Sequence, residues 1–379
     1  MKKVSIALIE LHSHTEVLSA FLHTLQGFDL RIFASSAFNP EDMLPGYEQN
    51  MPVFICSPKQ SNSEFIAQYK LMLDSFDWLI FITLEKHFSF FARQSWRAKT
   101  ILVIHNGNYW LDYQMSLSLN SLKNILRWAK SVVLRQEYFK RKILKTFDFI
   151  TFPNFIIQQY FLERGLVKKE KIFPCLPFVS RLILEKTEST TKKIVIIIPG
   201  AIRKETRDYY PVISAFEKVI PLFMRPVQFV LLGGPRNKFG RKVQHRFTTL
   251  TSNNFTVVCF PGYVSQEEYQ SWLIRADFLI LPLKRTMCYC ECREIGGLTK
   301  ISGSVNDMER FGKPALIADG YCVEKRLDAH VERYENEIDL SLRLLEWINN
   351  SEKLAEKKTA FIASFKPPDL NIATKFPFS

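Results

Sequence analysis

Short apolar segments rich in β-branched residues recur along this chain, and helix-like stretches separate them. In the first half the segments are 4–9, 30–34, 52–56, 78–82, 101–105 and 147–152. In the second half they are 194–199, 228–232, 256–260, 278–282 and 315–318. Segments that are apolar on both faces are typical of buried parallel strands. Their alternation with helices predicts an α/β fold with two Rossmann-like, doubly wound domains that face a central cleft.

A polar, charged segment separates the two sets of predicted strands and is interpreted as a linker, 181–193. We therefore predict an N-terminal domain over 1–180 and a C-terminal domain over 194–355, followed by a tail over 356–379. The length of 379 residues and the hydrophobic content of 47% suffice for two cores of ordinary size.

The net charge of +13 favours anionic partners, and part of it is concentrated in one segment. Residues 123–145 carry eight basic side chains and one acidic side chain, interleaved with apolar residues at helical spacing. Such a helix can lie on an anionic membrane surface. The alternative is a solvated helix whose apolar stripe packs on its own domain. No nucleic-acid-binding motif is present, so no nucleic acid partner is predicted.

The chain has no apolar run long enough to span a membrane, and its first apolar run is interpreted as a strand rather than a signal peptide. We expect a cytoplasmic protein that could associate peripherally with the inner face of a membrane. The odd number of cysteines, seven, predicts reduced thiols. The cluster Cys288, Cys290 and Cys292 has no second pair of ligands nearby, so a loop without a metal is expected.

The segment from Lys300 to Asp307 predicts a polar turn followed by a helix start. Backbone N–H groups of Ser302, Gly303 and Ser304 would bind an anion there, and Lys300 would add positive charge. Asp307, one turn into the helix, could hold sugar hydroxyls beside a bound phosphate. The alternative is that Ser304 and Asp307 form a capping box with no ligand.

Three further loops follow predicted strands, where open α/β sheets bind ligands. The first contains Gly200, Arg203, Lys204 and Arg207, whose cations could neutralise a diphosphate leaving group. The second contains the turn at Gly233, where the backbone allows close approach. The third contains residues that could meet a nucleotide base, namely Gly262, Tyr263 and Val264. The alternatives are a solvated basic loop and simple strand-to-helix turns.

Histidines follow two predicted strands of the first half. His105 could activate or orient an acceptor group, and His12 and His14 are weaker candidates for the same role. The alternative for each is a structural loop histidine. The sequence lacks G-x-G-x-x-G, Walker A, H-E-x-x-H and Asp-x-Asp patterns, so no cofactor and no metal are predicted.

Taken in order, these elements of 194–318 resemble the nucleotide-sugar domain of GT-B glycosyltransferases, especially the family 4 group. The resemblance implies that Arg207 and Arg203 lie at the donor diphosphate, that 262–264 frames the base, and that Asp307 holds the ribose. Asp307 stands where that family has the second glutamate of its E-x7-E motif, and Thr299 stands where it has the first. It also implies that the tail could cross back to the first domain.

The resulting hypothesis is a metal-independent glycosyltransferase, hexosyltransferase-like, acting in cell-surface glycan or polysaccharide biosynthesis. Its donor would be a nucleotide-diphosphate sugar, and its acceptor a hydroxyl of a glycan or lipid-linked molecule. Two alternatives are a non-catalytic GT-B-like assembly partner, which the loss of the acid at Thr299 favours, and a sugar-nucleotide epimerase of similar fold.

Overall fold

The computed structural model describes residues 3–12, 14–39, 51–113, 122–184, 193–290 and 292–365. Glu291 and most of the predicted linker lie outside these residues, as does the end of the predicted tail, 366–379.

The first sheet has six parallel strands in the order β3-β2-β1-β4-β5-β6. They are β1 (Ser5–Glu10), β2 (Asp29–Ala34), β3 (Val53–Ile55), β4 (Trp78–Thr83), β5 (Lys99–Val103) and β6 (Phe149–Thr151). The helices between and after them are α1 (Thr15–Thr24), α2 (Asn62–Gln68), α3 (Lys70–Leu73), α4 (Phe88–Phe91), α5 (Gly107–Leu111), α6 (Leu122–Val133), α7 (Gln136–Thr146) and α8 (Phe155–Glu163).

The second sheet also has six parallel strands, in the order β14-β13-β10-β7-β8-β9. They are β7 (Ile194–Pro199), β8 (Val227–Leu232), β9 (Phe255–Cys259), β10 (Phe278–Leu281), β13 (Ala315–Ala318) and β14 (Val331–Tyr334). The helices are α9 (Tyr210–Val219), α10 (Lys238–Thr248), α11 (Gln266–Arg275), α12 (Gly303–Arg310), α13 (Lys325–Asp328), α14 (Glu337–Asn349) and α15 (Ser351–Ser364). Numbered within its own domain, each sheet runs 3-2-1-4-5-6, the doubly wound order.

The central strands of both sheets contribute side chains to two apolar layers, one on each face of the sheet. Ile6 and Leu8 of β1 pack in one core cluster of the first domain, while Ala7 and Ile9 pack in the cluster on the opposite face. The strand β7 divides in the same way between the two clusters of the second domain. Burial of both faces explains why these strands appear in the sequence as continuous apolar segments.

The predicted α/β fold with two doubly wound sheets is confirmed, and all predicted strands form. The prediction omitted β14 and a two-stranded antiparallel hairpin made by β11 (Thr286–Tyr289) and β12 (Cys292–Ile295). The cysteine cluster that was expected to lie in a loop therefore lies in this hairpin. Its partly exposed pattern carries a weaker strand signal than the buried sheet.

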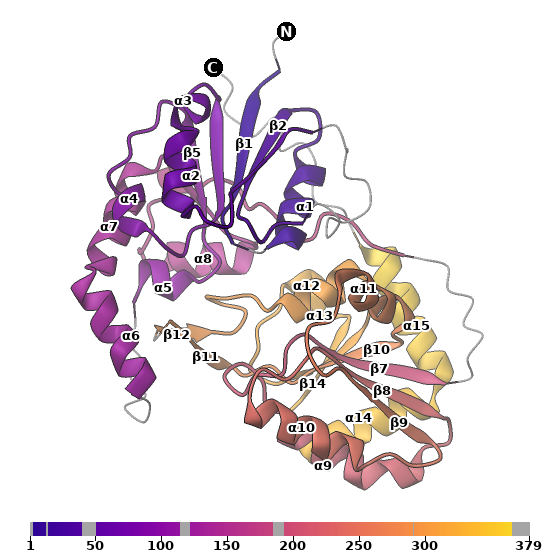
Figure 1. Cartoon of the computed structure of the whole chain (residues 1–379). Helices are drawn as coiled ribbons and strands as arrows, with labels where there is room; N and C mark the ends of the chain where they lie inside the picture. The colour runs from indigo at the N-terminus through magenta and orange to yellow at the C-terminus, as the bar shows by residue number, and fades with distance from the viewer. Residues whose placement is uncertain are drawn as a thin grey trace.

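The two domains form separate lobes, and the hairpin extends from the second lobe to α5 of the first (Figure 1). The final described helix, α15, packs on the second domain, where Leu354 and Phe361 join its core clusters. The predicted crossing back to the first domain would involve residues beyond 365, which lie outside the described chain.

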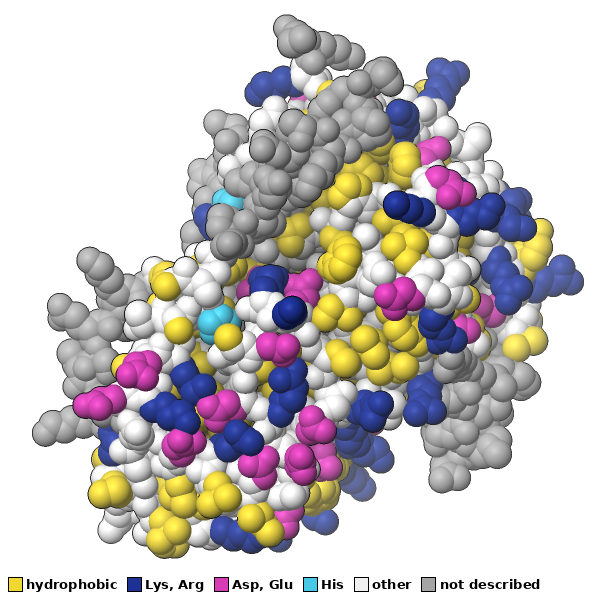
Figure 2. Space-filling view, turned by 180° about the vertical axis from the view of Figure 1, so that it is seen from behind, with side chains coloured by type: hydrophobic (Ala, Val, Ile, Leu, Met, Phe, Trp, Pro, Cys, Tyr) yellow, Lys and Arg dark blue, Asp and Glu magenta, His cyan; other side chains and the backbone are white. Residues whose placement is uncertain are grey.

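Acidic and basic side chains are interleaved over the second domain, the lower lobe of Figure 2. Ion pairs such as Lys357–Glu332 and Lys358–Asp277 account for part of this mixture. Lys and Arg side chains dominate the right-hand edge of the upper lobe (Figure 2), the side on which Figure 1 places α6 and α7 when turned.

Candidate donor and acceptor site

A cavity of about 640 Å³ lies between the two domains. It opens at the carboxyl ends of strands from both sheets, where ligands bind in open α/β folds. The first domain lines it with His14, Glu16, Val17, Glu85, His105, Asn106 and Phe178. The second domain contributes Arg203, Glu205, Thr206, Arg236, Asn237, Leu283, Met287, Cys288, Tyr289, Lys300, Ile301, Ser302, Gly303 and Asn306.

Glycines pack three loops of the second domain against one another, backbone on backbone. A Cβ atom on Gly233 would lie 2.6 Å from the carbonyl oxygen of Gly200, and one on Gly234 would lie 2.0 Å from that of Gly262. Gly200 also has a φ of 87°, which glycine adopts without strain. The close approach predicted at Gly233 therefore serves loop packing. Gly200, Gly233 and Gly262 are not among the residues that line the cavity.

The residues of the predicted base-binding loop differ in their exposure to solvent. Val264 is buried in the second domain's core, whereas Tyr263 is 87% exposed. Neither side chain lines the cavity. Their contact with a base remains a prediction.

Arg207 is buried and its guanidinium is engaged within the protein. It donates hydrogen bonds to the carbonyl oxygens of Ala201 and Pro199 and to Oγ of Ser304 at 2.6 Å. These bonds tie the loop after β7 to the first turn of α12. Arg207 is absent from the cavity lining, and so is Lys204, whose side chain is solvent-exposed.

Two other arginines face the cavity with no partner. Among the described residues, neither Arg203 nor Arg236 forms a hydrogen bond or ion pair through its side chain, and both are exposed to the cleft. The pKa of Arg203 is lowered because surrounding protein replaces water and because Arg236 is close by. Sequence reasoning identified Arg203 and omitted Arg236, which directly follows the recognised Gly-Gly-Pro turn.

The first turn of α12 borders the cavity beside these arginines. Its N-cap is Ser302, whose Oγ accepts a hydrogen bond from the Ser304 N–H at 3.3 Å. Gly303 is exposed, and a Cβ atom there would meet no atom within 4 Å. The prediction named three N–H groups, but the Ser302 N–H donates to the Tyr321 hydroxyl at 2.7 Å and the Ser304 N–H to Ser302, so among the described residues only the Gly303 N–H is left open to a ligand.

Asp307 lies deeper than its predicted role suggests. Its Oδ2 accepts a hydrogen bond from the Tyr269 hydroxyl at 2.8 Å, and its Oδ1 lies 3.8 Å from Arg310. Burial raises the pKa of Asp307 to about 6, although Arg310 opposes this. The side chain does not cap the helix, because Ser302 does. Asn306, one residue earlier, lines the cavity instead.

Lys300 joins the two domains at the edge of the cavity. Its Nζ donates to Oδ1 of Asn106 and lies 4.6 Å from the centre of the Tyr289 ring. Burial lowers the pKa of Lys300, while the charges of Glu294 and Glu85 oppose that change.

The wall formed by the first domain holds paired ionisable side chains. Nδ1 of His14 lies 3.4 Å from Oε1 of Glu16, and the His14 ring stacks on His105 with centroids 5.0 Å apart. His105 is within 2.7 Å of the Ile82 carbonyl oxygen through Nε2. Behind them, Glu10 is buried, and this burial raises its pKa to about 7.

The position of the missing family acid has a different function here. Thr299 is fully buried, and its hydroxyl donates to Glu294 on the hairpin. Glu294 in turn accepts the backbone N–H groups of Asn108 at 3.2 Å and Tyr109 at 2.9 Å, at the start of α5. The carboxylate therefore holds the two domains together. No sequence pattern predicted this role of Glu294.

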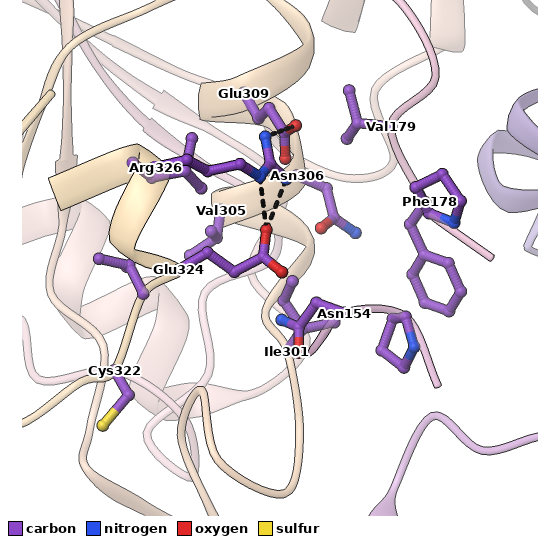
Figure 3. Close-up of a pocket in the computed structure, with 14 residues that line it drawn as sticks. Asn154, Phe178, Val179, Ile301, Val305, Asn306, Glu309, Cys322, Glu324 and Arg326 are labelled. Carbon is purple, nitrogen blue, oxygen red and sulfur yellow. Dashed lines mark hydrogen bonds and ion pairs between the residues drawn. The ribbon is translucent and has the colours of Figure 1, made fainter. Parts of the chain in front are cut away.

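A second, much smaller cavity lies on the other side of α12, again between the domains (Figure 3). Its volume is about 20 Å³, roughly enough for one water molecule. Arg326 pairs with Glu309 at 2.5 Å and with Glu324 at 2.6 Å, as the dashed lines in Figure 3 show. Phe178, Ile301 and Asn306 line both cavities and so form the wall between them.

Among the described residues, no group of three or more His, Cys, Asp or Glu side chains could hold a metal ion. Within the same part of the chain, no helix has the length and apolarity to span a bilayer.

Two doubly wound domains that face one another across a cleft define the GT-B fold, and this chain has that fold. Its structure is similar to that of Anabaena HepE in complex with UDP-glucose, with a TM-score of 0.60, 11% identity and 97% of each chain covered. It is also similar to a glycosyltransferase from Rickettsia africae, with a TM-score of 0.57, 11% identity, and 99% of this chain and 98% of that chain covered.

A third similar structure is the complex of S. aureus MnaA with UDP, with a TM-score of 0.51 and 12% identity over 94% of this chain and 91% of that chain. No protein-family model matches the sequence. No curated protein matches it either.

Proposed function

We propose that this protein is a glycosyltransferase that moves a sugar from a nucleotide-diphosphate sugar to an acceptor hydroxyl. The observation that carries the proposal is the pair of unpartnered arginines, Arg203 and Arg236, facing the cavity beside the open backbone of Gly303. We further propose a hexosyl donor, no metal requirement, and a role in cell-surface glycan or polysaccharide biosynthesis.

The charge arrangement supports a diphosphate as the group bound by the second domain. Two nearby guanidinium groups that form no ion pair among the described residues repel each other, with Glu205 offsetting part of the charge at Arg203, and a bound dianion would relieve that repulsion. Arginine matches phosphate oxygens through its planar fork, and the start of α12 adds the backbone N–H of Gly303. As the glycosidic bond breaks, negative charge grows on the departing oxygen, so these groups would stabilise the transition state.

The bound ligands of similar structures suggest where to begin. HepE was solved with UDP-glucose and MnaA with UDP, so uridine is the first base to test. In the proposal Arg207 positions the loops around the diphosphate. Asp307 would reach a ribose only by leaving Tyr269 and Arg310, whereas Asn306 already lines the cavity.

The test is thermal unfolding of the protein with UDP, GDP, ADP, CDP and TDP. A ligand that binds only the folded state raises the midpoint according to its occupancy. We expect one diphosphate to raise it selectively, and Arg236→Gln or Gly303→Val to remove that rise. Arg241→Gln is the matched control, because Arg241 is an exposed arginine of α10 outside the cavity.

The alternatives predict other outcomes. Binding without release of nucleotide from any sugar donor would favour the non-catalytic assembly partner. Conversion of a nucleotide sugar to an isomer without nucleotide release would favour the epimerase. No midpoint shift with any diphosphate in a folded sample would contradict the glycosyltransferase proposal.

We also propose that α6 and α7 contact an anionic membrane surface, at the cytoplasmic face where a lipid-linked acceptor would lie. Four apolar side chains in this region are exposed: Leu126, Val132, Val133 and Leu134. Basic side chains lie next to them and are exposed too: Lys130, Arg135, Arg141 and Lys145. Several side chains of the predicted segment 123–145 lie outside the description, and Lys140 is buried against Tyr109 rather than exposed.

Sedimentation with vesicles tests this contact. We expect binding to vesicles that contain phosphatidylglycerol and weaker binding to neutral phosphatidylcholine vesicles or in high salt. Val133→Asp should weaken it, whereas Met224→Asp, an equally exposed apolar position of the second domain, should not. Equal binding by both variants would contradict the proposal.

A further inference from the structure

His14 has one ring nitrogen engaged and one available on the cavity wall. Nδ1 lies 3.4 Å from Oε1 of Glu16, and an ionised carboxylate only accepts hydrogen bonds, so the proton lies on Nδ1. Nε2 then carries the lone pair, and no hydrogen bond engages it among the described residues. The side chain is 37% exposed and lines the cavity.

His105 supports this ring and is itself poorly placed to move a proton. The Ile82 carbonyl oxygen can only accept, so Nε2 of His105 carries its proton and donates it at 2.7 Å. Burial and the nearby His14 hold the pKa of His105 well below its usual range. A neutral ring thus stacks on His14 with an interplanar angle of 27° and fixes its orientation.

The charged neighbours of His14 come from several elements. Glu16 lies on α1, Glu10 at the end of β1 and Glu85 after β4, and their charges favour the protonated ring. Burial opposes them, and their combined effect raises the pKa of His14. A histidine tuned in this way exchanges protons near neutral pH.

Resting on the proposed function, we infer that His14 is the general base that takes the proton of the acceptor hydroxyl, with Glu16 as its positioning residue. The acceptor O–H bond breaks and its proton passes to Nε2. The acceptor oxygen forms a bond to the anomeric carbon. The bond from that carbon to the diphosphate oxygen breaks, and its electron pair leaves with the nucleoside diphosphate.

The proposed roles of the groups on the two cavity walls predict the stereochemical outcome of the transfer. The base stands on the first domain, whereas the unpartnered cations, Arg203 and Arg236, stand on the second. In the proposed step the acceptor enters from the His14 side and the diphosphate departs toward the arginines, on opposite faces of the anomeric carbon. A single displacement of this kind inverts the anomeric configuration.

The test uses the full chain and an α-linked nucleotide sugar whose diphosphate raises the unfolding midpoint, with water as acceptor. We expect ¹H NMR to detect the β anomer of the free sugar first. His14→Ala should lower the rate of nucleotide release by about 100-fold or more. His245→Gln, on exposed helix α10, is the matched histidine control and should leave the rate unchanged.

Glu16→Gln distinguishes a positioning role from loss of folding. Without the Glu16 charge the pKa of His14 falls, so the acidic limb of kcat/KM against pH should move to lower pH. Donor binding, measured by the unfolding midpoint, should persist in both variants.

If no nucleotide binds the wild-type protein, the proposed function itself fails. If nucleotide binds, three results would each overturn only this inference: release of the α anomer first, wild-type rates in His14→Ala, or an acidic limb unmoved by Glu16→Gln. A protein that binds donor but never releases nucleotide also contradicts it, since His14 then has no reaction to assist.

Discussion

Single residues explain where this chain departs from simple pattern reasoning. Arg207 was expected at a diphosphate and instead bonds to two carbonyl groups and a serine hydroxyl. Asp307 was expected at a ribose and is paired with Tyr269 and Arg310. A sequence shows that a cation or an acid is present, but the tertiary partners decide whether its charge is available to a ligand.

Removal of Arg207 should lower the stability of the fold, because its hydrogen bonds are internal and it does not line the cavity. Arg207→Ala removes the donor to the Ala201 carbonyl and to the Ser304 hydroxyl and leaves the Pro199 carbonyl with the Ser304 hydroxyl alone, so the free energy of unfolding should fall by about 2–4 kcal/mol. Urea denaturation measures it. Arg203→Ala, which removes no internal bond, is the control and should change stability little. Equal losses in both variants would contradict the assigned roles.

Glu10 should make stability depend on pH. Its pKa in the fold, about 7, exceeds the ordinary value of 4.5, so the protonated form favours folding. The stabilisation is fully present below pH 4.5 and is lost as the pH rises through 7. Glu10→Gln stays neutral, so its stability relative to wild type should rise by about 3 kcal/mol over that range.

Denaturation curves at several pH values test this dependence on Glu10. Asp29→Asn, at an exposed position, is the control. A difference between Glu10→Gln and wild type that does not vary with pH would contradict the assignment.

At the scale of elements, the sequence predicted those parts that depend on burial and turn geometry. β7 and β13 form with the predicted limits, because buried strands need continuous apolar residues. The hairpin was not predicted, because its strands are short and mix polar with apolar side chains. Arg236 was not predicted as a site residue, because the glycines before it are accounted for by a turn and need no ligand nearby. The open helix start at Gly303 was predicted, since small polar residues before a helix favour it.

Substitution by alanine should destabilise the protein at Gly234 and have no effect at Gly303. Gly234→Ala places a Cβ atom against the Gly262 carbonyl and should destabilise the second domain by about 2 kcal/mol or more. Gly303→Ala meets open space and should leave the unfolding midpoint unchanged. Thermal unfolding of both variants checks this. A large loss in Gly303→Ala would mean that the start of α12 is not open to a ligand.

At the scale of the whole molecule, the hairpin and the segment after it fasten the domains to each other. The Gly107 N–H donates to the Thr299 carbonyl at 2.7 Å, beside the buried Glu294 carboxylate that caps α5. On the opposite side of α12, the Phe155 N–H donates to Glu324 at 3.2 Å. The first of these bonds links the segment after His105 to the segment before Gly303, and the second links the start of α8 to the residue before α13.

Glu294→Ala should therefore loosen the domain contact. The free energy of unfolding should fall by about 2–4 kcal/mol, since buried N–H groups of α5 lose their acceptor. Hydrogen exchange at 107–111 and 293–300 should quicken together. Glu267→Ala, at an exposed position of α11, is the control. Unchanged exchange at both segments would show that other contacts hold the domains.

The proposed function requires that the second domain bind a nucleoside diphosphate between Arg203, Arg236 and the start of α12. Calorimetric titration of the protein with UDP, followed by the other diphosphates if UDP gives no heat, tests it most directly. We predict one site per chain for one of them, lost in the Arg203→Gln/Arg236→Gln double variant and retained in Arg241→Gln. Binding that survives the double variant, or no binding by any diphosphate to the folded wild type, would contradict this site.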